Sequence, residues 1–341
     1  DIGSKAVTIP STIDRYKVTG IGWSAFSGCT GLKSITIPSS VTEIGGYAFR
    51  GCKGLKSITI PSSVTEIGEN AFRGCKGLTS ITADKNNKNY TSVNGVLFNK
   101  NKTEILAYPN AKSSSYVIPS SVTYIGEYAF SGCTGLTSVK FEKSSNIQAF
   151  YAGTFSYCTS LTEINIPNSV KKISGRISED KTPYGCFEGC TSLKSVTIPS
   201  SVTEIDDDTF KGCTGLTSVT IPNSVTVIGW SAFEGCTGLT SITIPNSVTV
   251  IGWSAFRGCT GLKSVTIPNS VTYIGEGAFG DCTGLTSVTI PSSVTEIYEW
   301  AFYGCTSLKS VTIPSSATYI GEGAFGYTSD DKISGFTIYG K

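Results

Sequence analysis

The polar and apolar positions of this chain follow a repeating alternation that predicts short β-strands. In the stretch 32–38, Ile35 and Ile37 alternate with polar residues, and a period of two is the pattern of a half-buried strand. Proline then ends the strand, because it has no backbone N–H to donate to a ladder. A second stretch, 41–45, alternates more weakly. Its brief, glycine-punctuated run favours a short extended or 3-10 segment over a full helix.

This two-part unit returns along the chain at a constant spacing. The step of twenty-three from Cys29 to Cys52 is repeated from Cys52 to Cys75, and six further cysteines from Cys190 to Cys305 keep the same step. Self-similarity at such a period indicates a solenoid, in which each repeat buries its core against its neighbours. A phenylalanine three residues before each of these cysteines is expected to stack into an internal spine.

The period is interrupted at three places, which hold 35, 2 and 9 residues beyond one repeat. Length alone would suggest two domains, but stacked repeats behave as one quasi-one-dimensional unit. We therefore predict a single domain over residues 1–341. The larger insertion, at about 84–118, carries an Asn94-Gly95 pair between alternating stretches, which predicts a hairpin; it is either a third candidate binding feature or a variant repeat inserted for curvature. The smaller insertion lies at about 174–185.

The repeat consensus resembles that of a known family. The pattern Cys-x-x-Leu-x-x-Ile-x-Ile-Pro-x-x-Val-x-x-Ile-Gly-x-x-Ala-Phe, found from Val7 to about Tyr339, resembles the BspA-like, or Treponema pallidum type, leucine-rich repeat. We predict a right-handed curved solenoid of the α/β repeat type, mostly β, with a parallel sheet on the concave face and short extended or 3-10 segments on the other. The resemblance implies a secreted or surface protein of host-associated bacteria or some protists, with adhesion as its role. Fold alone does not fix function.

Twelve cysteines raise the alternatives of a disulfide framework or a metal site. Eleven of them occupy one repeat position, where stacking forms a uniform ladder with no unique pairing. We interpret them as buried thiols that pack as small hydrophobic side chains. Cys186 stands instead where other repeats have alanine, four residues before Cys190. It is either a small buried replacement or, in an exported protein, half of a Cys186–Cys190 disulfide.

The chain contains no histidine, which excludes Ser-His-Asp and Cys-His nucleophilic machinery. The remaining candidates are carboxylates at Asp206, Asp207 and Asp208, and Glu179-Asp180 in the smaller insertion. Either set could supply half of a glycosidase pair or calcium ligands, but consecutive carboxylates without a calcium-loop spacing are typical of a solvated turn. We predict no enzyme activity, no cofactor and no metal site.

Charge and hydropathy exclude two kinds of partner. The 27 Lys and Arg and 25 Asp and Glu residues give a net charge of +2, which provides no basic footprint for nucleic acid. No stretch of 18 apolar residues is present, so no membrane insertion is predicted. The chain begins with Asp1 and has no methionine, so we interpret it as a trimmed form whose export signal lies outside it. We expect a monomer, and the family resemblance implies that it is secreted or at the cell surface.

Any binding is expected to use exposed positions of the repeats. Serine and threonine columns on the sheet face could hydrogen-bond a ligand, or could simply be soluble strand formers. In the turn before Ala-Phe, tryptophan replaces glutamate in some repeats, and Trp230 and Trp253 should lie one repeat apart on the same edge. Such aromatic residues are enriched at interaction hot spots, although a tryptophan can also pack against its own turn. The candidate binding residues are Trp23, Trp230, Trp253, Tyr124, Tyr273, Tyr319, Thr220, Thr243 and Thr266.

The sequence therefore favours a non-catalytic binding module that adheres to host proteins, glycans or other cells. The alternative is a structural stalk that presents another domain. An enzyme working through surface carboxylates is a third, remote hypothesis.

Overall fold

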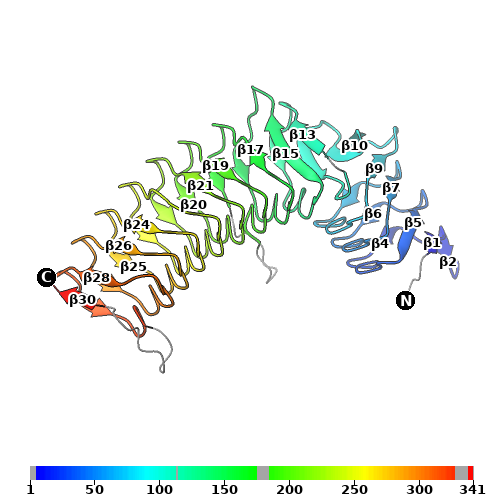
Figure 1. The fold of residues 1–341 in the computed structure, drawn as a ribbon. Helices are drawn as coiled ribbons and strands as arrows, with labels where there is room; N and C mark the ends of the chain where they lie inside the picture. The colour runs from blue at the N-terminus through cyan, green and yellow to red at the C-terminus, as the bar shows by residue number, and fades with distance from the viewer. Residues whose placement is uncertain (1–4, 113, 175–183, 327–336, 341) are drawn as a thin grey trace. The chain divides into compact units, whose positions relative to one another are not determined.

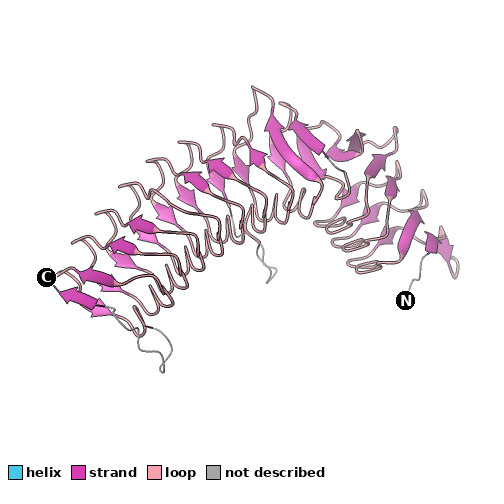
Figure 2. Ribbon diagram, in the orientation of Figure 1, coloured by secondary structure: helices cyan, strands magenta, loops and turns pink. Residues whose placement is uncertain are grey.

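The computed structural model describes residues 5–112, 114–174, 184–326 and 337–340, and these residues form strands and turns without a helix (Figure 2). They build a β-solenoid of about 13 turns with a long parallel sheet, which confirms the predicted fold class. We call each turn a rung. Its first segment is the strand that ends at proline, and its second segment is the shorter strand that precedes the Ala-Phe turn.

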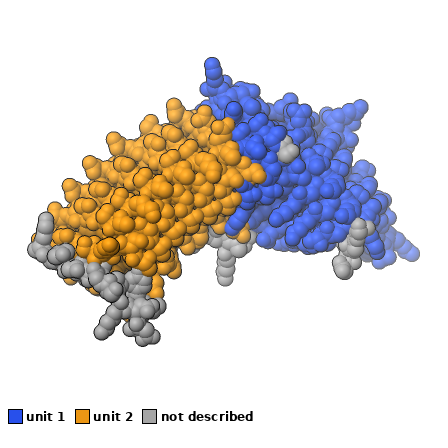
Figure 3. All heavy atoms as spheres, viewed as in Figure 1, with its two compact units in different colours: residues 1–147, 153–159 blue, residues 148–152, 160–341 orange. Residues whose placement is uncertain are grey.

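The chain divides into two compact units, residues 1–147 with 153–159 and residues 148–152 with 160–341 (Figure 3). We describe each by itself. The prediction that residues 1–341 act as a single domain stays a prediction.

In the first unit, strands of successive rungs pair in parallel, and most partners lie one repeat apart, as Glu43 and Glu66 do (Figure 1). An antiparallel pair, β2 and β3, lies near its start. The first-segment strands are β1 (Lys5–Thr8), β5 (Leu32–Thr36), β7 (Ser57–Ile60), β9 (Ser80–Ala83), β13 (Ser114–Ile118) and β15 (Leu136–Phe141). The other strands outside the insertion are β2 (Thr12–Ile13), β3 (Tyr16–Lys17), β4 (Gly20–Ile21), β6 (Glu43–Ile44), β8 (Glu66–Ile67) and β14 (Tyr124–Ile125).

The larger insertion forms an antiparallel hairpin, as its Asn-Gly pair predicts. Strands β10 (Tyr90–Val93) and β11 (Val96–Asn99) pair around Asn94 and Gly95, whose φ angles of 50° and 79° suit a type I′ turn. Strand β12 (Glu104–Ala107) pairs antiparallel with β11 and parallel with β14, so the insertion rejoins the rungs through a second-segment strand.

In the second unit, the most continuous sheet comes from the second segments. The first-segment strands of the second unit are β17 (Glu163–Ile164), β19 (Ser195–Thr197), β21 (Ser218–Thr220), β24 (Ser264–Thr266), β26 (Ser287–Thr289), β28 (Ser310–Ile313) and β30 (Thr337–Gly340). The second-segment strands form an eight-stranded sheet in the order β16 (Ala149–Phe150), β18 (Lys172–Ile173), β20 (Glu204–Ile205), β22 (Val227–Ile228), β23 (Val250–Ile251), β25 (Tyr273–Ile274), β27 (Glu296–Ile297) and β29 (Tyr319–Ile320).

The sequence pattern predicts the main sheet in the first segments. In the second unit, the most continuous sheet instead joins the second segments, whose alternation is weaker. The physical reason lies in the Ile-Gly pair. The N–H of Gly252 donates to the carbonyl of Ile228 at 2.8 Å, which extends the ladder beyond the strand. The rungs approach so closely there that a Cβ on Gly252 would lie 2.8 Å from the carbonyl carbon of Gly229. Glycine therefore permits the close contact that keeps the second segments in register.

Phenylalanines and cysteines fill the core between the segments. The predicted aromatic spine is present: Phe210, Phe233, Phe256 and Phe279 stack face to face with centroids 5.2 to 5.3 Å apart. Eleven of the twelve cysteines are buried, with Cys29 half-exposed, and all twelve are thiols rather than disulfides. The buried-thiol interpretation is thus confirmed for ten of the eleven repeat cysteines, and Cys29 is the exception.

Candidate binding surface

Two tryptophans of adjacent rungs form the most regular exposed aromatic feature of the second unit. Trp230 and Trp253 follow the Ile-Gly pairs of β22 and β23, and their rings stack with centroids 4.9 Å apart and planes within 5°. Their side chains remain 46% and 50% exposed. The Trp230 ring also rests on the next turn, because a Cβ on Gly252 would lie 2.9 Å from its Cδ1 atom. Each ring therefore packs against a neighbour and is also about half exposed. Both features that the sequence analysis offered as alternatives, packing and exposure, are present together.

A second aromatic group lies in later rungs of the second unit. Tyr273 and Tyr319 lie in β25 and β29, and Tyr298 lies between them, 5.9 Å and 5.7 Å from their rings. Trp300, two residues beyond Tyr298, is 46% exposed. Sequence reasoning missed both Tyr298 and Trp300, although the departure of Ile297-Tyr298-Glu299-Trp300 from the usual Ile-Gly-x-x was a signal that could have found them.

Two predicted residues lie apart from this group, in the first unit. Trp23 is 64% exposed and lies 4.9 Å from the ring of Tyr47, in the neighbouring rung. Tyr124 is 37% exposed and belongs to the sheet that contains the hairpin, whereas Trp23 follows β4 in a different sheet. These two predicted residues therefore belong to different sheets of the first unit.

The predicted threonines lie on the other segment of the second-unit rungs. Thr220 pairs with Thr197 in the β19–β21 ladder, and Thr220, Thr243 and Thr266 are all exposed. Within the described parts of the chain, these three hydroxyls make no hydrogen bond to protein. The hydroxyl of Thr217, by contrast, donates to the Lys194 carbonyl at 3.0 Å and ties two rungs together. The hydroxyls of Thr220, Thr243 and Thr266 can therefore bind a ligand without the loss of a hydrogen bond between rungs.

The three consecutive aspartates serve the solenoid itself. Asp206 accepts a hydrogen bond from the Ser174 hydroxyl at 2.9 Å, and Asp207 accepts one from the N–H of Trp230 at 2.8 Å. Asp208 pairs with Lys211 at 3.3 Å, and burial raises the pKa of its carboxyl. All three carboxylates thus hold neighbouring backbone or side chains. The other candidate pair, Glu179-Asp180, lies outside the described residues.

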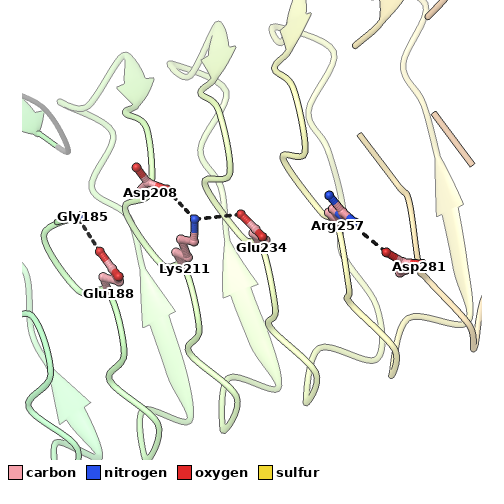
Figure 4. Close-up of polar contacts among 7 residues, drawn as sticks. All are labelled: Gly185, Glu188, Asp208, Lys211, Glu234, Arg257 and Asp281. Carbon is pink, nitrogen blue, oxygen red and sulfur yellow. Dashed lines mark hydrogen bonds and ion pairs between the residues drawn. The ribbon is translucent and has the colours of Figure 1, made fainter. Parts of the chain in front are cut away.

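A column of alternating charge runs beside these aspartates (Figure 4). Lys211 lies 3.0 Å from Glu234 as well as 3.3 Å from Asp208, and Arg257 lies 3.2 Å from Asp281 in the following rungs. Because these ions are one-third to one-half exposed, each pair contributes little to stability. Both bases of the column are nevertheless paired with acids of their own or the next rung.

Neither a metal centre nor a membrane span is evident in the part of the chain that the structure describes. Among those residues, no cluster of three or more histidine, cysteine, aspartate or glutamate side chains could hold a metal ion. No helix there is long and apolar enough to cross a bilayer.

The repeats match a known family of proteins, and the structure resembles several solved ones. A family model described as BspA type Leucine rich repeat region matches residues 4–113, 102–238, 180–266 and 228–339. The structure of a leucine rich cell surface protein from Faecalibacterium prausnitzii A2-165 is 36% identical with a TM-score of 0.59, over 70% of this chain and 59% of that one. This chain thus spans less than two thirds of that protein's chain. A search of curated proteins finds no match.

Two further leucine-rich repeat proteins resemble the chain over more of its length. The protein from Bacteroides ovatus ATCC 8483 is 27% identical with a TM-score of 0.50, over 93% of this chain and 91% of that one. The protein from Eubacterium ventriosum ATCC 27560 is 24% identical with a TM-score of 0.50, over 97% and 85%, and it supports the fold alone.

Proposed function

Because the chain belongs to the BspA-type leucine-rich repeat family, we propose that it is a non-catalytic binding module, secreted or held at the cell surface, that adheres to proteins, glycans or other cells. The resemblance inferred from its repeat consensus is confirmed by the family match, and a similar structure is that of a bacterial cell-surface protein. The observation that carries the proposal is the half-exposed, stacked pair of Trp230 and Trp253.

An exposed aromatic pair favours ligand binding, because it presents apolar surface to water. Two indole rings in one plane-parallel stack present a rigid apolar edge, and large aromatic side chains dominate the energetics of most interfaces. The ladders on both sides hold this edge in place: the N–H of Ser231 donates to the Trp253 carbonyl at 2.9 Å. A preorganised edge loses little conformational freedom on binding. The exposed threonines of the first segments add hydroxyls that suit a glycan or a peptide backbone.

Binding to arrays of matrix proteins and glycans tests the proposal. We expect the intact chain to bind at least one class of ligand, and a double Trp230→Ala, Trp253→Ala variant to lose about a hundredfold or more in affinity, because buried aromatic anchors carry about 2 kcal/mol or more each. The control is Trp23→Ala, which removes an exposed tryptophan from the first unit. Circular dichroism checks that each variant is folded.

The outcomes separate the hypotheses. Equal loss in the Trp23→Ala control, or unchanged binding by the double variant, removes the tryptophan pair as the binding edge. An intact chain that binds nothing on either array favours the structural stalk instead.

A further inference from the structure

Three consecutive rungs near the end of the second unit carry acidic and aromatic side chains together. Glu276, Glu299 and Glu322 occupy the same position of successive rungs, each one repeat after the last. The backbone fixes this column, because the N–H of Gly277 donates to the Glu299 carbonyl at 2.9 Å and the N–H of Trp300 donates to the Glu322 carbonyl at 3.0 Å. We call these three glutamates, with Tyr298, Trp300 and Tyr319, the acid–aromatic face.

The aromatic side chains of this face lie among its carboxylates. Tyr319 is 43% exposed and its hydroxyl donates to Glu299 at 2.5 Å, which lowers the pKa of that carboxyl. The Trp300 ring rests on the turn beside Glu322, since a Cβ on Gly323 would lie 2.7 Å from its Cδ1 atom. Trp300 itself holds a left-handed backbone with a φ of 55°. An exposed indole is therefore fixed next to the acidic column.

Within residues 264–326, no basic side chain stands in the acidic column, whereas acids and bases alternate in the charged column of Figure 4. Glu188, Lys211, Glu234 and Arg257 alternate in sign from rung to rung (Figure 4). In residues 264–326, all of which the structure describes, five acidic residues accompany a single base, Lys309, which precedes the first-segment strand β28. Like charges on adjacent strands repel, so the column gains most from a cation supplied by another molecule.

Aromatic rings and carboxylates together recognise one ligand chemistry. A lysine ammonium or arginine guanidinium is attracted to the face of tryptophan or tyrosine, and the guanidinium also donates hydrogen bonds to a carboxylate. Carboxylates on successive strands, about 4.8 Å apart, lie within reach of the long, flexible side chains of an extended peptide that carries several cations.

We propose that the acid–aromatic face docks a lysine- and arginine-rich segment of a partner protein, a separate molecule from this chain. This inference rests on the proposed function as a binding module, because it names the chemistry of one ligand. Cationic side chains of the partner lie between the Trp300 and Tyr319 rings and the column of glutamates.

Fluorescence anisotropy with a labelled peptide of alternating arginine and glycine tests the proposal. We expect the intact chain to bind it and to ignore a peptide of alternating glutamate and glycine. A triple Glu276→Gln, Glu299→Gln, Glu322→Gln variant should lose about tenfold in affinity. Trp300→Gly, which places the residue of the neighbouring rungs at the left-handed position, should lose about threefold to fivefold. Added salt should weaken binding of the intact chain.

The control variant is Glu43→Gln, Glu66→Gln, Glu69→Gln, which makes the same change of charge on exposed glutamates of the first unit. Equal losses in the two triple variants, or no binding of the cationic peptide by the intact chain, overturn the proposal. So does concentration-dependent self-association in the ultracentrifuge that the second-unit triple variant abolishes, because a second copy would then be the occupant. Array binding that depends on Trp230 and Trp253 but not on these glutamates leaves the binding module standing while it overturns this inference.

Discussion

At the scale of single residues, the repeat cysteine is a hydrogen-bond donor as well as a space filler. The Sγ of Cys236 lies 3.2 Å from the carbonyl oxygen of Phe210 in the preceding rung. The same carbonyl accepts the N–H of Cys213 at 3.1 Å. An alanine would fill part of the space but donate nothing to this buried carbonyl. The spacing of the cysteines predicted their burial, whereas the bond depends on where the rungs place each carbonyl and could not be read from the pattern.

Burial makes these thiols unreactive in the folded protein. It raises the pKa of Cys213, Cys259 and Cys305 to about 12, and only a thiolate attacks an alkylating reagent. We therefore predict that iodoacetamide at about pH 8 modifies half-exposed Cys29 in the native chain while Cys236 is protected. Mass spectrometry of the digested protein reports the modified sites. Denatured protein, in which all twelve cysteines should react, is the control, and equal native rates at Cys29 and Cys236 would contradict the prediction.

At the scale of the elements, the turn that leads into the phenylalanine holds a left-handed residue two positions before it in most of the described rungs. Ser231, Ser254 and Trp300 have φ angles of 51°, 54° and 55° there, and Gly277 has one of 58°. This conformation lets the N–H of the residue donate to the next rung, as Ser254 does to Glu276 at 2.8 Å. The turn thus belongs to the inter-rung ladder and sets the direction of the exposed residue before it.

Ser231→Val should lower the stability of the protein by straining the backbone of this turn. A β-branched residue is strained at positive φ, and the left-handed region costs an ordinary residue about 1–2 kcal/mol, so we expect the variant to unfold at lower urea concentration. Thr220→Val is the matched control, because it places valine at an exposed strand position that suits it and should change the midpoint little. Equal shifts of the two midpoints would show that the turn carries no special strain.

The elements also show where sequence reasoning stops. Alternation, proline and the Asn94-Gly95 pair predicted the strands and the hairpin, because each is a local property of the backbone. The continuous sheet of the second segments was underestimated, since a two-residue strand such as Val227–Ile228 gives almost no periodic signal. Tyr298 and Trp300 were missed because they occupy positions that the consensus assigns to small residues. Their exposure follows from the packing of the next rung.

At the scale of the whole molecule, near-neutrality conceals an uneven distribution of charge. Residues 1–159 contain 16 Lys and Arg against nine Asp and Glu, a net charge of +7, while residues 160–341 contain 11 against 16, a net charge of −5. The balance over the full chain therefore says little about either unit. A ligand of either sign can find a unit of opposite charge, and salt dependence of binding will report which unit it uses.

The buried thiols make the stability of the whole solenoid depend on alkaline pH. A thiol of the unfolded chain ionises near its ordinary pKa of 9.0, whereas the folded pKa of Cys213, Cys259 and Cys305 is about 12. A raised folded pKa gives stability that is fully present below pH 9 and is lost as pH rises toward 12, at up to about 1.4 kcal/mol per thiol per pH unit. We expect the melting temperature to be level between about pH 6 and 8 and to fall steeply above 9.

Circular dichroism melts across this range make the measurement, and a triple Cys213→Ala, Cys259→Ala, Cys305→Ala variant makes the comparison. The variant should melt lower at neutral pH, since it lacks three buried donors, yet its melting temperature should fall less steeply above pH 9 because fewer groups gain charge on unfolding. An unchanged alkaline slope would mean that other groups, such as Tyr116 with its pKa raised by burial to about 12, control the transition. Because each rung is held only by its neighbours, ionisation anywhere along the thiol ladder weakens the contacts of two rungs at once.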